Sequence, residues 1–262
     1  MKLIKELLNN RALILQLAKN DFRNKYVTSY LGILWGFIPS IATMIIYWFI
    51  FNVGFRVMPV GNAPYLLWLM CGLIPWFFFS EGIMGGINSF IEYSYLVKKI
   101  VFKISILPIV KVMASFFVHI FFVVLNIYVF FFYGFKPTIY YLQILYYIFA
   151  IFCLTLSLSF LGATLILFFR DLGQIIMVVM QMLVWITPIM WDISMFSSKI
   201  VMILKLNPMF YIVQGYRDTF INNVWFWEHP VNTLYFWTII IVLFICGINL
   251  FKKLKPHFAD LL

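Results

Sequence analysis

Charged residues are scarce in this sequence. Only 11% of its 262 residues are charged and 65% are hydrophobic, whereas ordinary globular domains carry about 25% charged and about 45–50% apolar residues. A soluble core cannot bury this much apolar surface, so the lipid bilayer must be the main solvent. We therefore predict an all-α polytopic membrane protein that forms a single transmembrane domain over residues 1–262.

The motifs of nucleotide binding, metal binding and catalysis are also missing. The sequence contains no G-x-x-x-x-G-K-[ST] loop, no glycine-rich dinucleotide turn, no H-E-x-x-H and no cluster of cysteine and histidine. Its three cysteines, Cys71, Cys153 and Cys246, lie in apolar runs without pairing or metal spacing, which favours small core residues. We expect no catalytic residue, no metal and no cofactor on this chain, and no nucleic-acid partner.

Acidic residues are almost absent from the apolar stretches. Ion-coupled transporters carry acidic residues or histidines in the membrane to bind the coupling ion. Here Glu81 is the one acid well inside a stretch, and His119 is better explained as a hydrogen-bonded helix residue than as a proton relay. Glu81 either faces a polar lumen or makes a buried structural hydrogen bond, and Gly82, Gly85 and Gly86 would let another helix approach closely. The energy for transport is therefore expected from another subunit.

Six apolar stretches are long enough to cross a bilayer as helices, which takes about 20 residues each. They are residues Leu31–Val53, Tyr65–Phe90, Ile104–Tyr133, Tyr140–Phe169, Gly173–Met190 and Tyr235–Phe251. Pro75 should kink the second. Most of the 19 basic residues fall on the inside if the N-terminus is cytoplasmic, so the positive-inside rule predicts that both termini are cytoplasmic.

Two segments outside these spans have patterns of their own. Residues 1–27 place apolar side chains on one helical face and lysines on the other, which predicts an amphipathic helix along the inner membrane surface. A merely soluble cap helix is the alternative. Residues 191–230 are too polar to span and too aromatic for a free loop, so we expect short helices that re-enter the outer leaflet.

Seven stretches carry a family resemblance, in order along nearly the whole chain. They are "YLGILWGFIPS", "APYLLWLMCGLIPWFFFSEGI", "LVKKIVFKISILP", "FFRDLGQI", "TPIMW", "LNPMFYIVQGYRD" and "LKPHFADLL". With them the sequence resembles the membrane subunits of type-2 ABC exporters that move lipid-linked cell-surface polysaccharides. It is most similar to the teichoic-acid permeases, and O-antigen permeases share most of these motifs.

The resemblance implies partners and a location. It implies a multi-pass permease of the bacterial cytoplasmic membrane that pairs with a second copy of itself. Two cytoplasmic ABC ATPase subunits would hold ATP and Mg, and a lipid-pyrophosphate-linked polymer would be the cargo, in contact with membrane lipids. A small-molecule or drug exporter of the same permease family and a membrane scaffold are the alternatives from other classes.

The resemblance also makes residues 95–107 the coupling helix that docks into a groove of the ATPase. Apolar side chains recur there at helical spacing up to Ile104, with lysines between them. The family often has Phe-Pro-Arg where this chain reads Phe-Lys-Ile, which leaves the helix end open, and a plain basic loop is the alternative. The coupling candidates are Val97, Lys98, Lys99, Ile100, Val101, Phe102 and Lys103.

Aromatic residues make up 21% of the sequence. Many belong in interfacial belts, and others could line a path, because flat rings offer sugar C–H faces a low-entropy sliding surface. The candidates for a path are Trp35, Tyr47, Trp48, Trp185, Phe210 and Tyr211.

Polar candidates lie at both membrane faces. On the inner face, Arg11 and Lys19 could receive a pyrophosphate. Arg170 and Asp171 match the family's Arg-Asp signature, and a helix-boundary ion pair that caps the next helix is as good an explanation as contact with substrate phosphate. Arg217 is the candidate for an anion contact on the outer face, with a structural role as its alternative.

Overall fold

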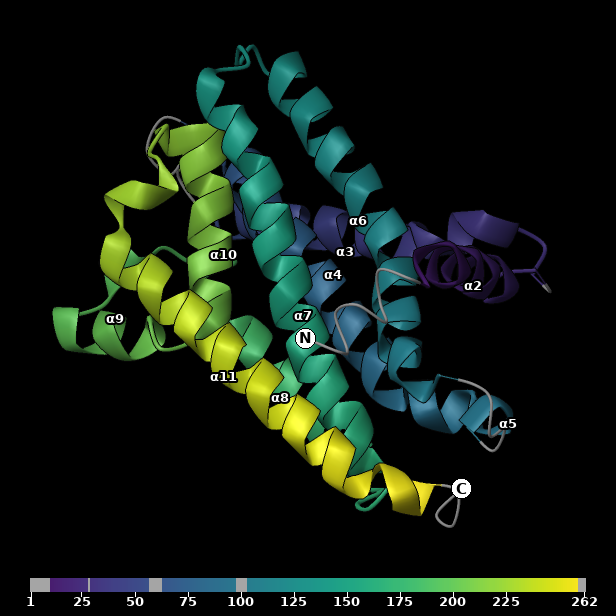
Figure 1. Ribbon diagram of the computed structural model, residues 1–262. Helices are drawn as coiled ribbons and strands as arrows, with labels where there is room; N and C mark the ends of the chain where they lie inside the picture. The colour runs from purple at the N-terminus through teal and green to yellow at the C-terminus, as the bar shows by residue number, and fades with distance from the viewer. Residues whose placement is uncertain (1–9, 28, 57–62, 98–102, 259–262) are drawn as a thin grey trace.

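The computed structural model describes residues 10–27, 29–56, 63–97 and 103–258, and in these ranges the chain is helical without an extended strand. Four helical stretches are long and apolar enough to cross a membrane, namely Tyr65–Glu92, Ile104–Phe132, Ile139–Ile166 and Pro230–His257. Their α-helices are α4 (Tyr65–Glu92), α6 (Leu107–Phe132), α7 (Ile144–Ile166) and α11 (Pro230–Leu254). Short 3-10 turns precede α6 and α7 and follow α11 (Figure 1).

The first and fifth expected spans are present as shorter apolar helices. Helix α3 (Ile38–Trp48) follows a 3-10 turn and continues into a π-helical turn, Phe49–Gly54. Gly32 interrupts the apolar stretch before α3 with a φ of 54°, in the left-handed region that glycine tolerates best. Helix α8 (Leu172–Ile186) ends where Thr187 turns extended, as expected for a residue before proline. Six full spans are therefore not confirmed.

Helix α4 is the centre of the bundle and packs against α6, α7, α10, α3 and α8 (Figure 1). Two of its glycines allow α7 to approach closely, because a Cβ at Gly82 would meet Thr155 and one at Gly86 would meet Ser159. The Ser159 hydroxyl also donates a hydrogen bond of 3.2 Å to the Gly82 carbonyl. The expected close helix approach is confirmed at these two positions.

The segment between α8 and α11 consists of short helices. They include α9 (Ser198–Leu204), α10 (Pro208–Arg217) and a π-helical turn over Asp218–Asn222. The Asn207 side chain accepts from the Met209 amide at the start of α10 and donates to Thr187 Oγ1 at 2.8 Å. Helix α10 is mostly buried against α4, α7 and α11 (Figure 1). The expected short helices are present, and their depth in a membrane stays a prediction.

Helix α2 (Arg11–Asn24) is the described part of the expected amphipathic segment. Figure 1 shows α2 nearly end-on and α6 and α7 from the side, so α2 runs across the bundle. It buries Ile14 and Ala18 and packs against α6. Arg11 and Lys19 are exposed on it. Residues 1–9 lie outside the described residues, and membrane attachment of α2 stays a prediction.

Only part of the expected coupling helix can be compared with the structure. Helix α5 covers Ser94–Val97, and Ile104–Ile106 form a 3-10 turn. Lys98, Lys99, Ile100, Val101 and Phe102 lie outside the described residues. Lys103 is exposed.

Ile104 requires a correction. It was expected to anchor in a groove of the partner. The structure places it in the chain's own core, 8% exposed, in a cluster with Phe90, Leu107 and Phe258. Its apolar side chain is already buried by the C-terminal part of the bundle, so it is not free to fill a groove of another protein.

Candidate functional site

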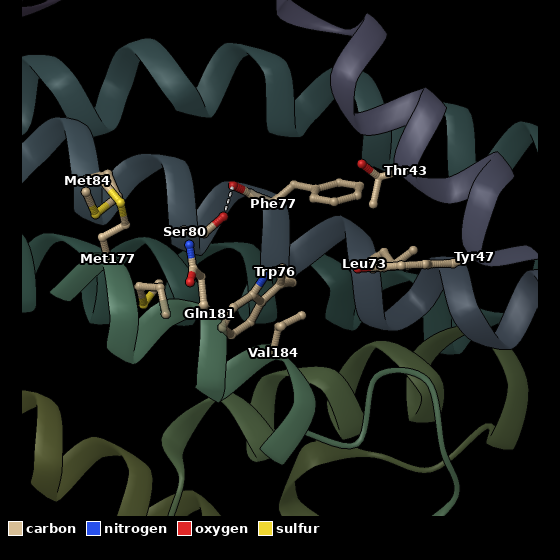
Figure 2. A pocket seen from close by; sticks show the side chains of 11 residues that line it. Thr43, Tyr47, Leu73, Trp76, Phe77, Ser80, Met84, Met177, Gln181 and Val184 are labelled. Carbon is tan, nitrogen blue, oxygen red and sulfur yellow. Dashed lines mark hydrogen bonds between the residues drawn. The ribbon is translucent and has the colours of Figure 1, made fainter. Parts of the chain in front are cut away.

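A cavity of about 270 Å³ lies between α3, α4 and α8 (Figure 2). We call it the aromatic groove. Tyr47 comes from α3, Trp76 and Phe77 from α4, and the aliphatic and thioether side chains of both α4 and α8 complete the walls. Its lining residues are Thr43, Tyr47, Leu73, Trp76, Phe77, Ser80, Met84, Met177, Met180, Gln181 and Val184.

Three polar side chains line the aromatic groove. The Thr43 hydroxyl donates to the Pro39 carbonyl at 2.8 Å, and the Ser80 hydroxyl donates to the Phe77 carbonyl at 3.2 Å. Figure 2 shows Gln181 extending from α8 toward α4. No hydrogen bond of the Gln181 amide is found among the described residues. The groove therefore combines ring faces with hydroxyl and amide groups, the chemistry that suits a polyol.

Of the six aromatic residues predicted to line a path, Tyr47 is the one that lines the aromatic groove in the described part of the chain. Tyr47 lines the aromatic groove, and its ring centre lies 6.5 Å from that of Trp185, which is exposed on α8. Trp48 is half-buried beside Tyr47 and is not among the lining residues. Trp35 is 44% exposed in the turn before α3, also outside the lining.

Phe210 and Tyr211 do not lie where a path was expected. They are 4% and 8% exposed in the core of the bundle. The Tyr211 hydroxyl is hydrogen-bonded to Tyr146 at 2.8 Å and to Thr233 at 3.0 Å. Because α10 packs inward against α4, α7 and α11, its aromatic side chains hold helices together instead of facing a groove.

A second cavity, of about 440 Å³, lies between the C-terminal part of α2, α4 and the start of α6. We call it the charged cavity, because three carboxylates and two lysines line it. Its lining residues are Asp21, Phe22, Asn24, Lys25, Glu81, Met84, Gly85, Glu92, Lys111, Ala114 and Ser115. Met84 lines both cavities, so the charged cavity and the aromatic groove adjoin along α4.

Glu81 is partnered in the charged cavity. Its Oε1 lies 2.5 Å from Nζ of Lys25, and the two side chains are 36% and 54% exposed. Burial alone would lower the pKa of Lys25, but the Glu81 carboxylate more than offsets this, so that pKa is raised. Glu81 is therefore paired and partly exposed rather than buried, and its position in a transport lumen stays a prediction. Exposed ion pairs contribute only about 0–1 kcal/mol, so this pair can be opened cheaply.

Lys111 joins three helical segments in the same cavity. Its Nζ lies 2.6 Å from Asp21 on α2 and 2.5 Å from Glu92 at the end of α4. The Tyr93 hydroxyl donates to the same Asp21 oxygen at 2.5 Å. Burial and the neighbouring Asp21 carboxylate raise the pKa of Tyr93 well above its ordinary value, so its hydroxyl stays protonated and able to donate at neutral pH. This network fixes α2 to the bundle.

The remaining polar candidates lie apart from both cavities. Arg217 is 4% exposed, so the predicted outer-face anion contact is corrected to a structural position inside the bundle. Arg170 and Asp171 are exposed in the turn between α7 and α8, and Asp171 occupies the N-cap position of α8 without a side-chain capping hydrogen bond. His119 is hydrogen-bonded to the Tyr216 hydroxyl at 2.9 Å, as expected for a structural histidine.

Comparison with known proteins decides the family. The family model described as "ABC-2 type transporter" matches residues 12–221. The chain belongs to this family. An "O-antigen export system permease protein RfbA" of Klebsiella pneumoniae is 31% identical over 260 residues, covering 95% of each chain. A protein with the same name from Myxococcus xanthus is 25% identical over 262 residues, covering 99% of each chain.

Family membership makes this chain a membrane-embedded permease subunit of an ABC transporter. Permeases of this family work with an ATPase partner, which fits the absence of a phosphate-binding loop from the sequence. The named relatives are O-antigen exporters. The predicted specificity for teichoic acid is not confirmed by them.

Sequence reasoning missed several residues of the permease that line the two cavities. Trp76 and Phe77 were not distinguished from other aromatic residues, and the structure singles them out because both line the aromatic groove between α3, α4 and α8. Ser80 and Gln181 carried a usable signal, since each is a polar side chain inside an apolar stretch. No local pattern in the sequence pointed to Asp21, because its partners Tyr93 and Lys111 lie 72 and 90 positions away.

Proposed function

We propose that this permease exports a lipid-linked polysaccharide of the O-antigen type across the bacterial cytoplasmic membrane. ATP hydrolysis on a partner subunit supplies the energy. The observation that carries this proposal is the aromatic groove, where Tyr47, Trp76 and Phe77 lie beside the polar side chains of Ser80 and Gln181. Ring faces can pack against sugar C–H groups while the amide and hydroxyl exchange hydrogen bonds with sugar hydroxyls.

The contacts between the groove and the polymer need to be weak for transport. A conduit must bind its cargo well enough to admit it and loosely enough to release it. Among the residues that the structure describes, no charged side chain lines the aromatic groove. The groove therefore offers many shallow contacts and no strong ionic one. A polymer can move along such a surface without stopping at a single tight site.

A second copy of the chain completes the conduit in this proposal. Helices α3 and α8 flank the aromatic groove and expose large apolar side chains on their outer faces. They include Ile41, Ile45 and Ile46 on α3 and Val178, Val179, Met182 and Ile186 on α8. Pairing two such faces would bury apolar surface and enclose the groove between the two subunits.

The cytoplasmic side supplies energy coupling and headgroup recognition. Two ATPase subunits dock on the part of residues 95–107 that precedes the buried Ile104, and their closure on ATP moves the permease helices. Arg11 and Lys19 are exposed on α2, where they are free to meet the pyrophosphate of a lipid-linked substrate. Arg170 and Asp171 are exposed as well and remain candidates for contact with substrate phosphate.

Teichoic acid stays a prediction that rests on the sequence resemblance. The curated relatives favour the O-antigen alternative. The two cargos differ in charge, because teichoic acid is a polymer of phosphodiesters whereas an O-antigen is built from sugars. A direct comparison of the two lipid-linked polymers therefore separates the two substrate classes.

The test is the ATPase activity of the permease co-purified with its ATPase in lipid nanodiscs. Activity is measured without substrate, with lipid-linked O-antigen and with lipid-linked teichoic-acid precursor. We expect stimulation by the O-antigen lipid, and we expect the double variant Lys98→Glu/Lys99→Glu to abolish it. Stimulation by the teichoic-acid precursor alone would reverse the substrate assignment. Stimulation by small amphiphiles alone would favour a drug exporter, and full stimulation of the double variant would reject the coupling helix.

A further inference from the structure

The charged cavity has a lining that the proposed export of a polysaccharide does not by itself explain. Asp21, Glu81 and Glu92 bring three carboxylates, and Lys25 and Lys111 bring two ammonium groups. The lining therefore carries one more formal negative charge than positive charges. An excess of carboxylate disfavours a phosphate group, whereas it does not repel an uncharged ligand.

The carboxylates keep free hydrogen-bonding capacity. Lys25 bonds only Oε1 of Glu81, Lys111 bonds Oε2 of Glu92, and both Lys111 and Tyr93 bond Oδ1 of Asp21. Within the described residues, the second oxygen of each carboxylate has no side-chain partner. An ammonium group has three protons, so Lys25 also retains donors. The cavity thus offers acceptors and donors side by side.

A sugar hydroxyl matches this arrangement because it donates and accepts at the same time. A phosphodiester only accepts, so it would leave the carboxylate oxygens unsatisfied. Phe22 adds an apolar ring to the wall, against which the C–H face of a pyranose can pack. The cavity volume of about 440 Å³ lies within the range of about 300–1,000 Å³ that is usual for small-molecule sites.

The charged cavity lies next to the aromatic groove along α4, so a ligand could pass from one to the other. Ser80 lines the aromatic groove, and the next residue, Glu81, lines the charged cavity. Met84, one turn further along α4, lines both. A sugar held by Glu81 would therefore lie directly beside the rings and amide of the groove. The charged cavity also borders α2, the helix proposed to receive the lipid pyrophosphate.

We propose that the charged cavity is a loading subsite that binds an uncharged sugar residue through its hydroxyls and selects against phosphate-rich polymers. This inference rests on the proposed function, since it assigns the step before the aromatic groove. The exposed pair Lys25–Glu81 opens to admit the sugar. Lys111 stays bound to Asp21, because these two side chains are only 13% and 14% exposed.

The test uses the permease–ATPase complex in nanodiscs and two synthetic probes. Both carry the same polyprenyl diphosphate, one linked to a neutral tetrahexose and the other to a glycerol-phosphate tetramer. Equilibrium binding is measured for the parent protein and for Glu81→Gln, which keeps the shape and removes the charge. We expect the parent to prefer the tetrahexose probe and Glu81→Gln to weaken its binding about tenfold, because two or so hydrogen bonds to a charged acceptor are lost or weakened. Binding of the glycerol-phosphate probe should stay equal or improve.

Two further variants protect the test against misfolding and indirect effects. Gly85→Leu changes no charged side chain and adds bulk to the lining of the cavity, where a Cβ would make ordinary contact with Lys111 at 3.7 Å. It should reduce tetrahexose binding as strongly as Glu81→Gln. Glu228→Gln is the matched control, because Glu228 lies outside both cavities and caps the Trp225 amide.

The outcomes separate the loading subsite from the export proposal. If the parent binds the tetrahexose probe and neither Glu81→Gln nor Gly85→Leu weakens it, the subsite is rejected and polysaccharide export stands. Preference of the parent for the glycerol-phosphate probe would also reject the subsite. If neither probe binds or stimulates ATP hydrolysis, the proposed function itself fails.

Discussion

The guanidinium carbon of Arg217 lies 3.4 Å from the centre of the Trp68 ring, inside the bundle. Arg217 comes from the end of α10 and Trp68 from the first turn of α4, and both are buried. Its Nη2 also donates to the Ile189 carbonyl at 3.2 Å, in the stretch that follows α8. One side chain thus connects three segments that are distant in the sequence, through a cation–π contact and a hydrogen bond.

The first prediction concerns this contact. Arg217→Lys keeps the charge but loses the planar group that stacks on Trp68, and buried cation–π contacts contribute about 2 kcal/mol. We expect a lower unfolding temperature for the purified protein. Arg23→Lys, on the exposed side of α2, is the control and should leave that temperature unchanged. A melting temperature for Arg217→Lys equal to that of the parent would contradict the assigned stacking.

The second prediction concerns the attachment of α2. Lys111→Met removes the ammonium that joins Asp21 and Glu92, which leaves the poorly exposed Asp21 carboxylate with only the Tyr93 hydroxyl as a partner, at a cost of about 1 kcal/mol. We expect faster hydrogen exchange of the backbone amides in α2, measured by mass spectrometry on the reconstituted protein. Lys253→Met, an exposed lysine of α11, is the control. Unchanged exchange in α2 would show that its apolar contacts alone hold it.

The third prediction uses two neighbouring glycines of α4. A Cβ at Gly86 would press into the Ser159 side chain on α7, whereas one at Gly85 would make only ordinary contact with Lys111 at 3.7 Å. Overpacked interiors typically lose about 1–3 kcal/mol. We expect Gly86→Ala to destabilise the protein and Gly85→Ala to be neutral or stabilising in a thermal unfolding assay. Equal effects of the two substitutions would contradict the close packing of α4 on α7.

The fourth prediction concerns the aromatic groove. Gln181→Leu keeps the bulk of the side chain and removes the amide that faces the groove. A hydrogen bond contributes about 1 kcal/mol, so polymer export in cells should fall by about fivefold. Gln174→Leu is a matched control on the same helix, since Gln174 is exposed and outside the lining. Export that falls equally in both variants would point to a general defect of α8.

Local sequence patterns predicted the helices better than the site. The long apolar stretches of α4, α6, α7 and α11 are expected from composition alone, because a helix satisfies its own backbone inside a membrane. The short forms of α3 and α8 were missed. Hydropathy does not report where Gly32 or the Thr187–Pro188 pair breaks the backbone of an apolar run.

Residues that lie together in the site were harder to predict. Tyr47 was chosen for its ring and does line the groove, but Phe210 and Tyr211, chosen on the same ground, are buried. Composition indicates that aromatic residues are abundant and cannot indicate which face of a helix meets a neighbour. That choice depends on how α10 packs against α4, α7 and α11.

The sequence by itself determined that this protein is a helical membrane permease, because the scarcity of charge, the long apolar stretches and the ordered motifs are properties of the chain read in order. Only the tertiary structure decided that Glu81 meets Lys25 and that Arg217 stacks on Trp68. The partners are 56 and 149 positions apart, and no local pattern encodes a contact over such a separation. Such contacts depend on how α2 and α10 pack in the bundle. The two adjoining cavities likewise depend on how α3 and α8, and α2 and α6, meet α4.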